Sequence, residues 1–379
     1  MKKPLKILPL IALALLIMKG MSFAEEVPGT TLAALTDVQK YDRALHIMAM
    51  LMAGFGFLMV FLKRYGRSAL TATYLLVSTA IPLYFVVGAP GRLIDRLILA
   101  EFAAASLLIC AGAVLGRLKM GQYILLALLF VPFYAFNEKI LNGGMGLITG
   151  KFIDTGGSIA IHAFGALFGL GVAMAMTTQQ ESEAPIECDE TSERYSLLGS
   201  MVLWIFWPSF CSALVAPEAV PRTAVNVIFA LCGSTLSTYF ASVKLRGKIS
   251  AADIANAALA GGVAIGSVCD STVPTYAFEI GIFAGIISTF GFAVIQPRLA
   301  ARTHKIDTCG VLNLHGLPGI FGGLAAIVLV KGIQSESQLN GILATIFISC
   351  IAGLITGKIV SFMGRRKEPY VDSEEFEGA

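Results

Sequence analysis

The chain has 379 residues, of which 56% are hydrophobic and only 14% charged, and its mean hydropathy is +0.76. A soluble domain carries nearer ~25% charged residues, so this composition excludes a soluble enzyme and indicates a polytopic membrane protein whose surroundings are the lipid bilayer. The formal net charge of +3 is small, and nucleic acid is not an expected partner.

The seven cysteines are scattered, mostly inside apolar runs, and show neither a CxxC pair nor the spacing of metal ligands. We therefore expect no disulfide framework, no metal site and no cofactor.

Residues 1–24 have the pattern of a signal peptide. Three lysines precede a short apolar core at 7–18, and Ser22 and Ala24 supply the small residues that a signal peptidase needs. The alternative is an uncleaved extra helix, but a core of about a dozen residues is short for the ~30 Å of hydrocarbon in a bilayer. A cleaved signal implies a bacterial-type inner membrane and an N-terminus on the outer side.

Apolar runs predict an all-α fold with eleven membrane helices after the signal. Their approximate spans are 43–62, 68–88, 93–115, 121–142, 155–177, 196–216, 223–243, 251–268, 275–296, 308–331 and 340–362. The membrane domain is expected to run over 25–364, with half-repeats at about 43–177 and 196–331 and a last helix at 340–362. Residues 365–379 follow as a tail.

The placement of basic residues predicts the orientation. With the N-terminus outside, eleven spans put the C-terminus inside, and more lysines and arginines then fall in inner loops than in outer ones, as is usual for cytoplasmic loops. The longest loop, 178–195, is acidic and expected to be a flexible inner connector. The tail after Gly364 is polar and expected to be solvated.

Two stretches with the same pattern, D-T-x-G-x-x-x-x-H, organise the chain. They are Asp154-Thr-Gly-Gly-Ser-Ile-Ala-Ile-His162 and Asp307-Thr-Cys-Gly-Val-Leu-Asn-Leu-His315. Each opens a long apolar run, so each histidine is expected about two turns inside a membrane helix. Repeats of this kind commonly build a transport site at their interface, near the middle of the bilayer.

A polar side chain in a membrane span is costly and needs a partner. His162 and His315 could be two separate core histidines, each bonded to a neighbouring helix, but their matched positions favour a shared site. Two neutral imidazoles can bond to each other and present their remaining nitrogens to a lumen. Such a pair could bind, or relay a proton for, a small polar substrate.

Asp154 and Asp307 stand where the two helices begin, so both are expected to be N-caps. For Asp154, at the outer end of its helix, a second role is open: its negative charge could help a cation to lose water.

Small residues recur every fourth position after His162, at Gly165, Gly169 and Ala173, and predict close helix packing beside a narrow pore. Two phenylalanines are candidates for a gate, Phe102 amid alanines and Phe210 after a Trp-Pro-Ser sequence. From the residues alone, ordinary packing is the better interpretation of both.

Taken together, these motifs resemble the ammonium transporter superfamily, and its Rh branch more than its Amt branch. The matching stretches are Gly112-Ala-Val-Leu-Gly116, Ala135-Phe-Asn137-Glu138, Asp154 to Gly169, Leu203-Trp-Ile-Phe-Trp-Pro-Ser-Phe210, Leu259-Ala-Gly-Gly-Val-Ala264 and Asp307 to Gly319. They stand in the expected order and cover most of the chain from about 43 to 330.

The resemblance implies a homotrimer with one narrow conduction path through each subunit and two half-repeats of opposite topology. His162 and His315 match the twin histidines that line the hydrophobic pore. Phe102 and Phe210 match the two rings that close its outer mouth.

Three acidic residues also match. Asp154 corresponds to the aspartate near the outer recruitment region, Asp307 to its repeat partner, and Glu138 to a vestibule glutamate of Rh proteins. The chain departs from the family at Cys211, where Asn is usual, and has no counterpart of the Amt tryptophan cage around 139–142. Weak cation–π capture predicts a lower ammonium affinity than in Amt proteins.

Proteins of this family pass ammonia, taken from ammonium at the outer mouth, and also methylamine. The resemblance thus implies an ammonia channel or facilitator and not an enzyme. The main alternative is a passive carbon dioxide channel, which an apolar lumen allows. A sensor without flux would need an output domain larger than the tail, and an intramembrane enzyme is disfavoured because His46 and His304 lie near membrane edges.

Overall fold

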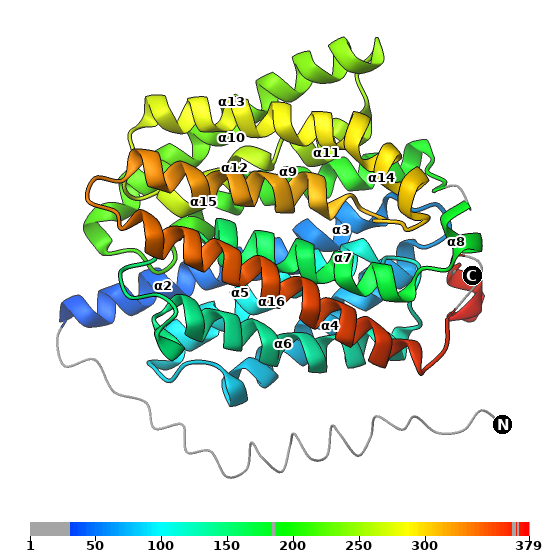
Figure 1. Ribbon diagram of the computed structural model, residues 1–379, viewed down its shortest axis with the longest axis horizontal. Helices are drawn as coiled ribbons and strands as arrows, with labels where there is room; N and C mark the ends of the chain where they lie inside the picture. Colours follow the sequence, from blue (N-terminus) through cyan, green and yellow to red (C-terminus); the bar gives the residue numbers. More distant parts are fainter. Residues whose placement is uncertain (1–30, 184–185, 366–368, 370, 379) are drawn as a thin grey trace.

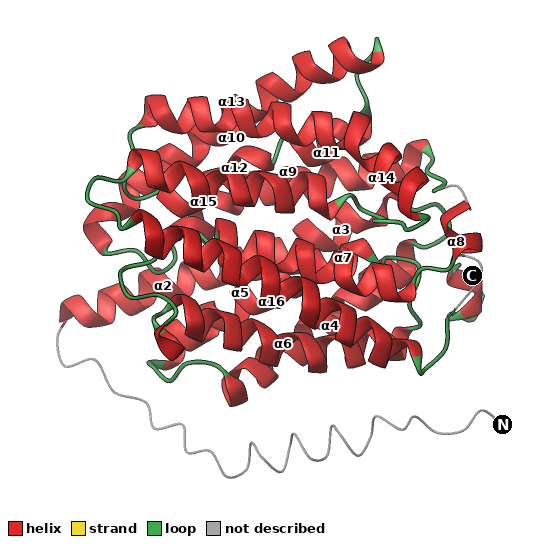
Figure 2. Cartoon of the chain, in the orientation of Figure 1, coloured by secondary structure: helices red, strands yellow, loops and turns green. Residues whose placement is uncertain are grey.

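The computed structural model describes residues 31–183, 186–365, 369 and 371–378, and in this part all the regular structure is helical (Figures 1 and 2). The expected signal peptide at 1–24 lies outside the described residues. Long helices run side by side along one direction, and the connecting loops gather at the two ends of the bundle (Figure 2).

The first half contains α2 to α7, and its helices have the following bounds. They are α2 (Thr31–Ala49), which continues through η1 (Met50–Phe55), α3 (Gly56–Leu58) and η2 (Met59–Phe61), then α4 (Gly66–Val87), α5 (Leu93–Ala113), α6 (Met120–Leu141), η3 (Gly144–Gly146), η4 (Ser158–Ala163) and α7 (Phe164–Met176).

The second half repeats this scheme after the short helix α8 (Gln179–Glu183). Its helices are α9 (Glu190–Ser212), η5 (Pro217–Ala219), α10 (Val220–Arg246), α11 (Ala251–Ala257), α12 (Ala260–Ile265), η6 (Gly266–Val268), α13 (Pro274–Phe290), η7 (Gly291–Ile295), α14 (Gln296–Thr303), η8 (Leu312–Gly316) and α15 (Leu317–Leu329). The last helix is α16 (Ser335–Ser361), and η9 (Asp372–Glu374) follows in the tail.

Ten helical segments of the described chain are long and apolar enough to cross a membrane. The 21-residue helix α5, almost entirely buried in the bundle, brings the candidate spans to the eleven that the sequence predicts. The prediction of an all-helical, multi-pass membrane fold is confirmed.

The helices that carry the two repeated motifs run in opposite directions. Lys305, just before η8, donates to the carbonyl oxygen of Thr177 at the end of α7, over 2.7 Å. At the other end, Val330 after α15 lines the same cavity as Asp154, which precedes η4. Each motif therefore begins where the other motif's helix ends, which is the arrangement of an inverted repeat.

The expectation of a flexible connector over 178–195 is wrong for much of that segment. Residues of α8 fold back onto the bundle, and Glu181 is buried with one carboxylate oxygen 3.8 Å from the guanidinium of Arg117, itself buried. Burial lowers the pKa of Arg117, and the charge of Glu181 opposes that shift. A carboxylate is stable in such a place only with a partner, and here the partner fixes the loop.

The tail is not simply solvated, contrary to expectation. The backbone N–H of Asp372 donates to Arg64 O over 2.7 Å. Its carboxylate accepts from the backbone N–H groups of Arg67 (3.1 Å) and Ser68 (2.8 Å), in the first turn of α4. These N–H groups have no partner within the helix, and Asp372 supplies the missing cap from more than 300 residues away.

Candidate functional site

Two buried histidines face each other at the centre of the bundle. The Nδ1 atoms of His162, in η4, and His315, in η8, lie 3.2 Å apart, and the two ring planes differ by only 6°. Trp207 stacks on the far side of His162 with ring centroids 5.6 Å apart, and Phe55 lies 6.3 Å from His315. Aromatic rings therefore hold the imidazole pair on both sides.

The repeated motif explains how each histidine reaches this place. Its fourth residue is Gly157 in one copy and Gly310 in the other, with φ of +76° and +67°. Only glycine adopts this conformation without strain, and the chain uses it to turn into a π-helical turn. The histidine follows five residues later in both copies, so the same local geometry delivers both rings.

The two aspartates of the motif have the geometry of N-caps. The carboxylate of Asp154 accepts from the backbone N–H groups of Ile159 (3.0 Å) and Ala160 (2.8 Å). That of Asp307 accepts from Val311 and Leu312, both at 3.0 Å.

Burial governs the charge of these two caps. Burial raises the pKa of Asp154, although the hydrogen bonds from Ala160 and from the hydroxyl of Ser267 oppose this shift. Burial also raises the pKa of Asp307 to about 6, against the opposing effect of its backbone hydrogen bonds. The positive end of each helix favours the ionised carboxylate, but burial opposes ionisation more strongly, so both pKa values lie above the ordinary value.

Two phenylalanine rings separate His162 from the end of the bundle at which Asp154 lies, which we call the outer end after the orientation that the sequence predicts. Phe102 of α5 and Phe210 of α9 have ring centroids 4.7 Å apart, and Phe210 lies 6.1 Å from His162. Both rings are almost completely buried. Beyond them, Phe102 lines a cavity of about 390 Å³, so the two rings lie between this cavity and His162.

The outer cavity is acidic. Three carboxylates line it, those of Glu138, Asp154 and Asp270, against the single ammonium of Lys151. The hydroxyl of Tyr84 donates to Glu138. Asp270 was not singled out from the sequence, because one aspartate between α12 and α13 carries no pattern. The excess of carboxylates gives the cavity a negative potential that attracts cations.

On the other side of the histidine pair lie two further cavities. The first, of about 30 Å³, is lined by His315 and Phe55, and the second, of about 220 Å³, reaches Arg246. Three side chains line both cavities: Phe61, Asn256 and Cys309. A cavity of 30 Å³ has room for roughly one or two molecules of the size of water.

Close packing keeps this path narrow. A Cβ atom on Gly165 would lie 2.5 Å from the carbonyl oxygen of Ser106, and one on Gly169 would lie 2.7 Å from that of Cys110. The backbones of α5 and α7 are thus in contact beside the histidines, as small residues at fourth positions allow. Cys211 is buried against Gly156, where a Cβ would meet its sulfur at 2.9 Å, so the thiol packs under the Asp154 loop.

The geometry defines a class of protein. An acidic outer cavity, an aromatic closure, a buried imidazole pair and two inner cavities follow one another through a multi-pass helical bundle, as in a membrane channel for a small solute. Within the described residues, no cluster of three or more His, Cys, Asp or Glu side chains is disposed to hold a metal ion.

The chain belongs to the ammonium transporter family, whose sequence profile, the Ammonium Transporter Family, matches residues 11–377. Among curated relatives, the ammonium transporter Rh type A of Bos taurus is 38% identical over 359 residues, which cover 88% of this chain and 82% of that protein. The chain is thus a member of the Rh-type ammonia/ammonium channel family and not an enzyme.

Solved structures agree with this placement. The Rh50 channel of Nitrosomonas europaea is 52% identical, with a TM-score of 0.89 over 91% of this chain and 93% of that one. A sensor Amt protein shares the fold at 16% identity, with a TM-score of 0.76 over 90% of this chain and 96% of that one.

Proposed function

We propose that this protein conducts neutral ammonia, and also methylamine, which it recruits as the protonated cations at its outer cavity. The observation that carries the proposal is the order of groups along one path. The carboxylates come first, then the rings of Phe102 and Phe210, then the pair of His162 and His315, and then the small inner cavity.

The energetics favour loss of the proton before the aromatic closure. A bare cation at the middle of a membrane costs several kcal/mol. An aliphatic amine has a pKa of about 10 in water, and each unit by which a dry lumen lowers it corresponds to about 1.4 kcal/mol of preference for the neutral base. The proton leaves to the water of the outer cavity, whose carboxylates stabilise it there, and the neutral base passes on.

The histidine pair then replaces the hydrogen bonds to water that ammonia loses when it leaves the outer cavity. Because the two Nδ1 atoms bond to each other, one ring has Nδ1–H and the other does not. One Nε2 atom is then an acceptor and the other a donor, while both rings stay neutral. An uncharged pair of this kind can bind ammonia without holding a cation in the lumen.

We further propose that the chain assembles as a homotrimer with its C-terminus inside the cell, as the family resemblance implies. Large apolar side chains stand on its surface, among them Phe240 (67% exposed), Val328 (83%) and Phe347 (67%). In a bilayer such side chains are covered by lipid or by further copies of the chain. The mass of the complex in mild detergent tests the trimer: a monomer would contradict it.

The experiment for the function measures flux and current together in vesicles that contain the purified protein. We expect ammonia and methylamine to enter with an internal pH rise and with little current, because the conducted species is neutral. A current proportional to the flux would show passage of the cation. Flux of carbon dioxide without flux of either amine would instead establish a gas channel, and vesicles without protein give the background.

A further inference from the structure

Among the described side chains that line both inner cavities, Asn256 alone carries a strong hydrogen-bond acceptor. Asn256 belongs to α11 and lines both inner cavities. Its Nδ2 donates to the carbonyl oxygen of Ala252 over 2.9 Å. Only the amide nitrogen can donate to a carbonyl, so this bond fixes the orientation of the side chain. Within the part of the chain that the structure describes, Oδ1 then has no donor and is available at the cavity wall.

On the side of the small cavity, the wall around Asn256 is otherwise poor in acceptors, whereas Glu193, Gln296 and Thr308 line the larger cavity beyond it. The small cavity beside His315 is lined mainly by apolar groups: Phe55, Leu58, Met59, Phe61, Leu108, Ile109, Gly112, Val311 and Leu314. The remaining lining groups are His315 itself, Asn256 and the thiol of Cys309, a weak hydrogen-bonding group. After His315, the next strong acceptor toward the inner end is therefore Asn256.

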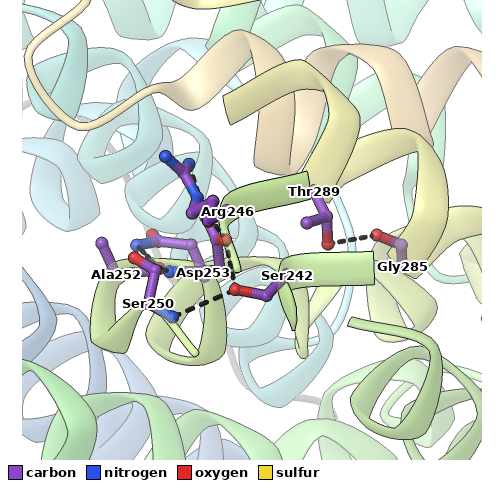
Figure 3. A network of polar contacts seen from close by, with 8 residues as sticks. Ser242, Arg246, Ser250, Ala252, Asp253, Gly285 and Thr289 are labelled. Carbon is purple, nitrogen blue, oxygen red and sulfur yellow. Dashed lines mark hydrogen bonds and ion pairs between the residues drawn. The ribbon is translucent and has the colours of Figure 1, made fainter. Parts of the chain in front are cut away.

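A network around the buried Asp253, one turn before Asn256, holds α11 in place (Figure 3). Asp253 is fully buried and accepts from Ser242 Oγ (2.7 Å), from Arg246 Nε (2.7 Å) and from a second nitrogen of the same guanidinium (2.9 Å). The backbone N–H of Ser250 donates to the same Ser242 hydroxyl over 3.0 Å. The network ties α11 to the end of α10, and residues three apart on a helix share a face.

We propose that Asn256 is a binding residue for the neutral amine at the inner exit of the pore. This inference rests on the proposed function. Oδ1 accepts an N–H of ammonia or methylamine that leaves the imidazole of His315, so the base crosses the small cavity without losing all of its hydrogen bonds. It then enters the larger inner cavity, where it takes a proton from water.

The test compares two replacements of the same shape, Asn256→Thr and Asn256→Val. Threonine keeps an acceptor oxygen at this position, and valine replaces it with a methyl group. We expect ammonia flux through N256V to fall at least about threefold below that through N256T, with both variants assembled like the parent. Asn340→Val, at an exposed position of α16, is the matched control and should conduct as the parent does.

Equal ammonia flux through N256T and N256V would overturn the inference, because the acceptor would then have no role. A parent that conducts neither amine would instead contradict the proposed function itself. A second readout separates binding from assembly: the ratio of ammonia to methylamine flux should fall in N256V, since an added methyl group favours the methylated solute. A loss of folded channels lowers both fluxes by the same factor, and an unchanged ratio counts against the inference.

Discussion

His162 Nδ1 and His315 Nδ1 lie 3.2 Å apart between rings that are almost parallel. At this distance the two nitrogens form one N–H···N hydrogen bond, in which one ring donates and the other accepts. The pair is therefore held in complementary tautomers. Within the described chain, the buried Nε2 of His162 has no hydrogen-bond partner. A buried polar atom without a partner costs free energy, and a passing substrate can supply that partner.

This relationship predicts that each histidine is needed for normal conduction. His162→Ala or His315→Ala removes the mutual hydrogen bond and leaves the other ring free to rotate. We expect methylamine uptake into vesicles to fall several-fold and its dependence on pH to change in both variants. His304→Asn, at an exposed position eleven residues before His315, is the control. Uptake and pH profile like those of the parent in both alanine variants would leave two histidines that only pack helices together.

The ring contact between Phe102 and Phe210 predicts a gate. Phe210→Ala removes the ring beside His162, and Phe102→Ala removes the ring that lines the outer cavity. We expect altered flux, and in F210A a measurable ammonium current, because water can then reach the pair. Gel filtration should show the same assembled complex as the parent. If both variants conduct like the parent and carry no current, the rings serve only packing.

The raised pKa of Asp307 predicts that the stability of the folded protein depends on pH. Its pKa is about 6 in the folded protein, above the ordinary value of 3.8 because of burial. Between these values the folded state binds more protons than the unfolded state, so the contribution of Asp307 to stability is largest below about pH 4 and decreases as the pH rises toward about 6.

The melting temperature in detergent checks this sign. Between pH 4 and 7, the parent should lose more stability with rising pH than Asp307→Asn, which keeps an acceptor oxygen for the backbone N–H groups and does not ionise. A steeper loss in the variant than in the parent would contradict the assignment.

The bond between the tail and α4 predicts a stability effect. Asp372→Ala removes the acceptor for the N–H groups of Arg67 and Ser68. Loss of an N-cap costs about 1 kcal/mol, so we expect a lower melting temperature and faster proteolysis of the tail. Glu377→Ala, at an exposed position of the same tail, is the matched control. Equal behaviour of the two variants would mean that the cap contributes nothing.

The orientation is testable by reporter fusions. The bias of basic residues and the eleven spans predict a C-terminus on the cytoplasmic side. A C-terminal alkaline phosphatase should therefore be inactive, and a C-terminal green fluorescent protein should fluoresce. The opposite result would reverse the proposed topology, with Asp154 then on the inner side.

The sequence by itself determined the number and type of the helices, because a bilayer forces every apolar run of this length to satisfy its own backbone. The repeat of D-T-x-G-x-x-x-x-H also fixed the local structure, since the glycine turn, the aspartate cap and the histidine all lie within nine residues of each other. For the same reason His162 and His315 could be named from the sequence as a candidate pair.

Contacts between distant segments were decided only by the tertiary structure. Nothing near Asp372 in the chain marks it as the cap of α4, because the N–H groups that it caps belong to a distant segment. Nor does the sequence around Glu181 indicate burial, because its partner Arg117 lies on another segment. Asn256 and Asp270 have ordinary surroundings in the sequence. They line the path because of where α11 and the segment between η6 and α13 pack, and helix packing depends on shape complementarity over many residues rather than on any local pattern.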